Sequence, residues 1–147
     1  MGESEEYRLL RGAILSRRAE LLLELEDDEG AWQAAQKAMN MGWYDATVHS
    51  IAGWAMFHMD DVDVALQQFD QALQLDPERI PALTGRAMAH MELEEWDSAH
   101  NDLSRAIQLD PENPSSYAFR AEVEVFMGTL ESARRDIEKA RNLSPED

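Results

Sequence analysis

Residues 65–77 read ALQQFDQALQLDP, and residues 99–111 read AHNDLSRAIQLDP, so one pattern returns after 34 residues. The same interval runs along almost the whole chain of 147 residues. Self-similarity at a fixed period of this length indicates stacked copies of one small structural unit. Three series carry the period: Ala31, Ala65, Ala99 and Ala133; Ala38, Ala72, Ala106 and Ala140; and Pro77, Pro111 and Pro145.

The spacing within one copy predicts a pair of helices. Ala65 and Ala72 are seven residues apart, which places them on one face of a helix after two turns. Phe69 lies between them as a large side chain beside two small ones, so a second helix can approach closely. Pro77 ends the helix, because a proline forces its predecessor out of the helical region. We expect first helices near 5–25, 46–59, 80–93 and 114–127, and second helices near 30–41, 62–75, 96–109 and 130–143.

A small residue, an aromatic, Ala-x3-Phe, Ala and then Pro at this period resembles the tetratricopeptide repeat, and residues 65–69 match it literally. The resemblance implies an all-α fold, a right-handed α-solenoid of about four helix-turn-helix units in one domain over residues 1–147. Trp43 stands where later copies have proline, so the first unit is degenerate. Residues 1–11 are expected to extend the first helix from a Ser4 cap. The units are 12–45, 46–79, 80–113 and 114–147.

Composition excludes several classes of function. Thirteen Lys and Arg stand against thirty Asp and Glu, a formal net charge of -17, which disfavours nucleic acid. The longest apolar run, residues 51–57, is too short for a membrane span. An acidic start without a basic-then-apolar order favours a cytoplasmic location.

The sequence also predicts no catalytic, metal or cofactor site. There is no cysteine, which removes thiol catalysis and zinc-thiolate sites. His49, His58, His90 and His100 fall at four different phases of the repeat, without carboxylates at ligand spacing. We found no glycine-rich phosphate loop or nucleophile elbow. We therefore expect a protein that is not an enzyme and needs no cofactor.

The resemblance implies that the first helices line a concave groove, and helical phase selects the side chains that face it. Trp54, Met88 and Phe119 are the proposed anchors, with Gly85 leaving a dip between them. The alternative is packing between neighbouring first helices, which we favour for Phe57, Met91, Val125 and Phe126. Trp54 and Met88 fit either interpretation. The predicted groove residues are Ser50, Ile51, Trp54, Phe57, Thr84, Met88, Met91, Phe119 and Glu122.

Members of the resembled family can bind acidic C-terminal tails through a clamp of cationic residues. In one register the matching positions here include Ser50, Trp54, Gly85 and Phe119, and the alternative register supplies no cation either. The expected function is a protein-interaction adaptor for a peptide or amphipathic helix, neutral to basic, with apolar anchors. The alternatives are a secretion-type or assembly chaperone and a self-assembling structural protein.

Overall fold

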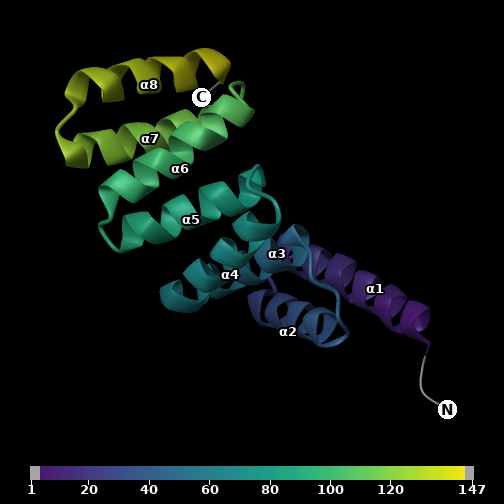
Figure 1. The fold of residues 1–147 in the computed structure, drawn as a ribbon. Coiled ribbons are helices and arrows are strands. Elements are labelled where there is room, and N and C mark those ends of the chain that lie inside the picture. Colours follow the sequence, from purple (N-terminus) through teal and green to yellow (C-terminus); the bar gives the residue numbers. More distant parts are fainter. Residues whose placement is uncertain (1–3, 145–147) are drawn as a thin grey trace. The chain divides into compact units, whose positions relative to one another are not determined.

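The computed structural model describes residues 4–144, which form eight α-helices and contain no strand. Figure 1 shows them as successive hairpins. The first helices of the hairpins are α1 (Glu5–Glu24), α3 (Ala46–His58), α5 (Ile80–Glu92) and α7 (Pro114–Met127). The second helices are α2 (Asp28–Asn40), α4 (Val62–Leu75), α6 (Trp96–Leu109) and α8 (Leu130–Leu143).

The helix bounds confirm the prediction from the repeat to within two residues. The largest difference is at α2, which begins at Asp28 because Asp27 Oδ1 accepts a hydrogen bond from the Gly30 amide at 3.0 Å. The predicted Ser4 cap is present, since its hydroxyl accepts from the Tyr7 amide. Pro145 lies outside the described residues.

The turn inside each hairpin repeats a backbone feature. Glu26, Asp60, Glu94 and Gly128 are spaced 34 residues apart, and each has a positive φ between 58° and 80°. This left-handed conformation closes the C-terminus of the first helix, and only Gly128 adopts it without a steric penalty. The feature is missed by a search for glycine, because three of the four residues carry side chains.

The chain divides into two compact units, with the boundary between Gly85 and Arg86 inside α5. The core of the first unit is built from the alanines of the repeat, including Ala31, Ala38 and Ala65, which are fully buried. Phe69 of α4 is its largest fully buried side chain. Within the second unit, Ala99 and Leu103 of α6 pack with Val123 of α7.

Candidate functional site

The predicted groove residues lie on the first helices of three hairpins. Four are on α3, three on α5 and two on α7. Ser50, Ile51, Trp54, Phe57 and Thr84 belong to the first unit, and Met88, Met91, Phe119 and Glu122 belong to the second.

Ser50 and Ile51 do not face outward, contrary to the prediction. Ser50 has 2% of its surface exposed, and its hydroxyl donates to the Ala46 carbonyl oxygen at 2.7 Å. Ile51 is 5% exposed and belongs to the same core cluster as Val48 and Ala52. The physical reason is that α3 contacts α1, α2 and α4, so little of its circumference is left open.

Trp54 is half-buried and engaged within its own unit. Its ring meets Phe69 edge-on at 5.7 Å between centroids, and Phe57 at 5.9 Å. Its indole Nε1 donates a hydrogen bond to the Pro81 carbonyl oxygen at 2.9 Å. These contacts tie α3 to α4 and to the start of α5, so Trp54 has a packing role.

Gly85 does not leave an open dip. A Cβ built there would lie 2.3 Å from Phe69 Cζ, so the ring fills the space that the missing side chain vacates. Gly53 borders the same ring, since a Cβ built there would lie 2.6 Å from Cδ1 and Cε1. Thr84, beside Gly85, turns its hydroxyl back to the Ile80 carbonyl oxygen at 3.1 Å.

The second unit contains a pocket that combines apolar and acidic side chains. Its volume is about 320 Å³, and it brings together three of the predicted residues, Met88, Met91 and Glu122. Phe119 does not line it and packs against the cluster around Leu103. The residues that line this pocket, called the Trp96–Phe126 pocket below, are Met88, Met91, Glu92, Glu94, Trp96, Glu122 and Phe126.

Two stacked aromatic rings form one wall of the Trp96–Phe126 pocket. The ring planes of Trp96 and Phe126 are 2° from parallel, with centroids 4.4 Å apart. Phe126 remains 60% exposed. Trp96 and Glu94 were absent from the sequence prediction. The signal that could have found them is a departure from the repeat, since Val62 and Leu130 stand at the positions equivalent to Trp96.

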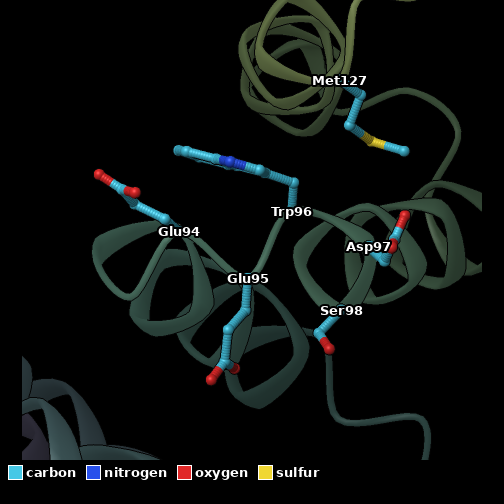
Figure 2. Close-up of a pocket in the computed structure, with 6 residues that line it drawn as sticks. All are labelled: Glu94, Glu95, Trp96, Asp97, Ser98 and Met127. Atoms are coloured by element: carbon cyan, nitrogen blue, oxygen red, sulfur yellow. The ribbon is translucent and has the colours of Figure 1, made fainter.

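The rim of the pocket is negative. Glu92, Glu94 and Glu122 are exposed, and no Lys or Arg is among the described lining residues. An adjoining hollow of about 490 Å³ adds Glu95 and Asp97. Figure 2 shows the indole of Trp96 projecting from the turn, with Glu94 beside it and Met127 across the hollow. The arrangement offers aromatic and thioether surface next to carboxylates.

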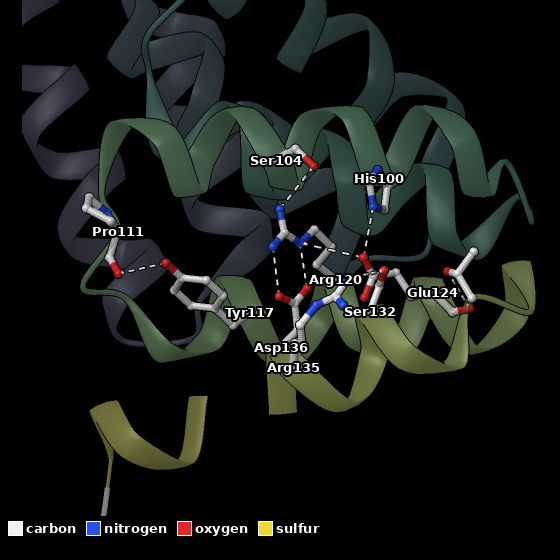
Figure 3. A network of polar contacts seen from close by, with 10 residues as sticks. His100, Ser104, Pro111, Tyr117, Arg120, Glu124, Ser132, Arg135 and Asp136 are labelled. Atoms are coloured by element: carbon white, nitrogen blue, oxygen red, sulfur yellow. Dashed lines mark hydrogen bonds and ion pairs between the residues drawn. The ribbon is translucent and has the colours of Figure 1, made fainter. Parts of the chain in front are cut away.

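Buried polar contacts fix the helices that carry these walls. Arg120 of α7 donates to Asp136 of α8 through Nε at 2.6 Å and Nη2 at 2.8 Å, and through Nη1 to Ser104 of α6 at 3.3 Å (Figure 3). The hydrogen bond with Asp136 raises the pKa of Arg120 above its ordinary value, so the guanidinium stays charged. His100 of α6 also lies 3.1 Å from Glu124 of α7.

The preceding hairpin repeats this ion pair. Arg86 of α5 donates to Asp102 of α6 through Nε and Nη2, each at 2.8 Å. Both residues of this pair precede their counterparts, Arg120 and Asp136, by 34 positions. Two-point pairing of this kind fixes the geometry as well as the distance of the partners.

Residues 4–144 give little support to a metal site or a membrane span. They contain no group of three or more His, Asp or Glu placed to hold a metal ion. None of their helices has both the length and the apolar character needed to span a bilayer. The candidate site is therefore the Trp96–Phe126 pocket, judged by its own geometry.

Comparisons with known proteins agree with the architecture. Residues 56–123 match the family model described as tetratricopeptide repeat. No curated protein matches the sequence. Among solved structures, MamA from Desulfovibrio magneticus RS-1 is similar with a TM-score of 0.82 and 18% identity, covering 93% of this chain and 77% of that one.

Two further structures are similar at comparable identity. A chain of the APC/C hetero-tetramer Cut9–Hcn1 gives a TM-score of 0.87 at 17% identity, covering 92% of this chain and 28% of that one. The first repeat domain of Spaghetti (RPAP3), bound to the HSP90 peptide SRMEEVD, gives 0.77 at 18%, covering 82% and 95%. At these identities the likeness shows the fold alone.

Proposed function

We propose that this chain, whose residues 56–123 match the tetratricopeptide-repeat family model, is a non-enzymatic interaction module for a cationic, amphipathic segment of a partner protein. The segment binds in the Trp96–Phe126 pocket. The observation that carries the proposal is the stacked aromatic pair beside two methionines and three exposed carboxylates. Exposed aromatic and methionine side chains gathered in this way are typical of contact sites.

The apolar part of the pocket supplies affinity. Aromatic side chains are enriched among the residues that dominate binding energy, and Phe126 presents its surface already stacked on Trp96. Met88 and Met91 are flexible and polarisable, so they can adapt to a partner side chain. A cation held over either ring gains a further attraction from the ring quadrupole.

The acidic part selects the sign of the partner's charge. Glu92, Glu94 and Glu122 attract Lys or Arg, and the formal net charge of -17 adds a long-range attraction. The domain of RPAP3 is bound to an acidic peptide, SRMEEVD. This chain has no cation at the positions of the family's clamp, so we expect it to discriminate against such a peptide.

The predicted groove residues have two kinds of role in this proposal, contact with the partner and support of the helices. Met88, Met91 and Glu122 are proposed to contact the partner directly. Trp54 and Phe57 are proposed to hold α3 in place, as their ring contacts favour. Thr84 and Phe119 are proposed to support the helices that carry the pocket.

The test uses two model amphipathic peptides, one of Leu and Lys and one of Leu and Glu, titrated into the full chain by calorimetry. We expect the Lys peptide to bind and the Glu peptide not to bind. Phe126→Glu and Glu122→Lys should each weaken binding about tenfold or more. Matched controls are Leu130→Glu, which alters an equally exposed side chain on α8, and Glu138→Lys on the same helix.

Circular dichroism should show the same helix content in all four variants, because the substituted residues are exposed. The proposal is wrong if both peptides bind equally well. It is also wrong if Phe126→Glu and Glu122→Lys bind the Lys peptide as the controls do.

A further inference from the structure

Helix α1 carries apolar side chains on two opposite faces. Gly12, Ser16 and Ala19 are buried against the first unit. On the other side, apolar residues are 43% to 76% exposed. The outer stripe of α1, as we call it, consists of Tyr7, Leu10, Ile14, Leu21 and the cap residue Leu25.

The spacing of the outer stripe suits contact with another protein. Its successive residues are three, four, seven and four positions apart, so they lie along one line of the helix, as the core positions of a coiled coil do. A soluble protein rarely leaves an aligned apolar row of this length uncovered, whereas single exposed apolar residues are ordinary.

The borders of the outer stripe are basic, in contrast with the rest of the molecule. Arg11 and Arg18 are seven residues apart and border one side, and Arg17 lies on the other. All three are exposed. With Arg8, residues 8–18 hold four of the thirteen Lys and Arg of the chain. Residues 8–18 are therefore a cationic, amphipathic segment of the kind that the Trp96–Phe126 pocket is proposed to bind. Over the whole of helix α1, Glu5, Glu6, Glu20 and Glu24 balance these four arginines.

We infer that the occupant of the Trp96–Phe126 pocket is the outer stripe of α1 from a second copy of this chain. The inference rests on the proposed function of the pocket and names its partner. Leu10 and Ile14 are one helical turn apart and enter the pocket beside Phe126. Arg11 and Arg18 meet the carboxylates of Glu92, Glu94 and Glu122, so apolar and charged surfaces are matched together.

The two surfaces that meet are different, so each copy keeps one of each kind available. Such head-to-tail contacts extend into rings or filaments. A pair formed by two outer stripes would bring Arg11, Arg17 and Arg18 of both copies together, and like charges oppose that pairing. The test below distinguishes this contact from pairing of two outer stripes and from binding of a different protein in the pocket.

The test mixes two full-length variants, each lacking one surface. Ile14→Glu removes the stripe and keeps the pocket, and Phe126→Glu does the reverse. Both side chains are 60% exposed, so neither change disturbs the core. Leu75→Glu, at a 53% exposed position on α4 outside both surfaces, is the matched control. The measurement is sedimentation velocity at loading concentrations spanning about three decades.

We expect the wild type and Leu75→Glu to gain mass with concentration, less so in high salt because the charges are screened. Each surface variant alone should stay monomeric, with association weakened about tenfold or more. An equimolar mixture of the two should form a 1:1 dimer and stop there, because one intact stripe then meets one intact pocket. Arg18→Glu should likewise lose association and regain it with Glu92→Lys as partner.

A wild type that stays monomeric at every concentration overturns the inference, and so does a mixture that fails to form the 1:1 dimer. Self-association of Phe126→Glu alone would overturn it too, in favour of stripe pairing. Binding of the Leu and Lys peptide tells the two proposals apart. If that peptide binds the pocket while the mixture stays monomeric, the proposed function stands and the second copy is excluded as occupant.

Discussion

Replacing Gly85 by alanine tests the packing of the first unit at its tightest point. In an exposed helix interior this change stabilises by about 1 kcal/mol, because glycine is the poorer helix former. Here the added Cβ would lie 2.3 Å from Phe69 Cζ and 2.4 Å from Cε1. Separations below about 3 Å require one of the two groups to move.

Phe69 has little room to move. Its side chain is fully buried, and a Cβ built at Gly53 would also lie within 2.6 Å of its ring, at Cδ1 and Cε1. Forcing an extra methyl group into a close-packed core costs about 1–3 kcal/mol, which exceeds the gain in helix propensity. We therefore expect Gly85→Ala to lower the free energy of unfolding by up to about 2 kcal/mol. In a chain of this size each kcal/mol shifts Tm by roughly 2–4 °C.

Thermal melting followed by circular dichroism measures the effect, and a double-mutant cycle assigns it. In the background of Phe69→Leu the ring is absent, so the added Gly85→Ala change should cost nothing further or stabilise. If Gly85→Ala melts above the wild type by the full gain in helix propensity, Phe69 is not tightly packed between α3 and α5. An equal loss in both backgrounds would place the strain elsewhere.

Three further results are expected. Ala99→Leu should lower the free energy of unfolding by about 1–3 kcal/mol, because Ala99 is fully buried where α6 packs on its neighbours. An unchanged Tm would contradict the predicted phase of α6. Asp60→Gly should stabilise the fold by up to about 1 kcal/mol, because a φ of 63° strains any residue with a Cβ. Chemical denaturation would show no gain in stability if the backbone at Asp60 were unstrained. Asp136→Ala should cost about 2–3 kcal/mol by the same assay, since it removes the two-point partner of Arg120, whose side chain is 21% exposed. A loss below about 1 kcal/mol would mean that solvent, Ser104 and Glu124 satisfy the guanidinium.

The helix bounds could be predicted because their signals are local. Alanines seven residues apart define a face, and proline or a capping aspartate such as Asp61 marks an end. The side of each helix that stays open was harder to predict. The phase of α3 placed Ser50 and Ile51 outside, but both are buried in a helix that contacts α1, α2 and α4. Period alone does not say how many neighbours a helix has.

The candidate site was predicted in part, for a related reason. Met88, Met91 and Glu122 were selected by phase and line one pocket. A repeat pattern relates equivalent positions, so it selects residues that recur. Trp96 and Phe126 are thirty positions apart and stack because one begins α6 and the other ends α7. A contact between non-equivalent positions is set by tertiary structure, which a repeat search does not contain.

The recurring ion pairs Arg86–Asp102 and Arg120–Asp136 bear on how such a chain can change its length. The hairpins α5–α6 and α7–α8 each neutralise their own partly buried arginine, because both partners lie in one copy of the repeat. A gene that duplicated residues 80–113 would add a unit whose buried arginine arrives with its own carboxylate. Lengthening by whole repeats then creates no unpaired buried charge, whereas insertion of a single helix would create one. Unequal crossing-over in whole repeats is therefore the route of growth and shrinkage that the electrostatics permit.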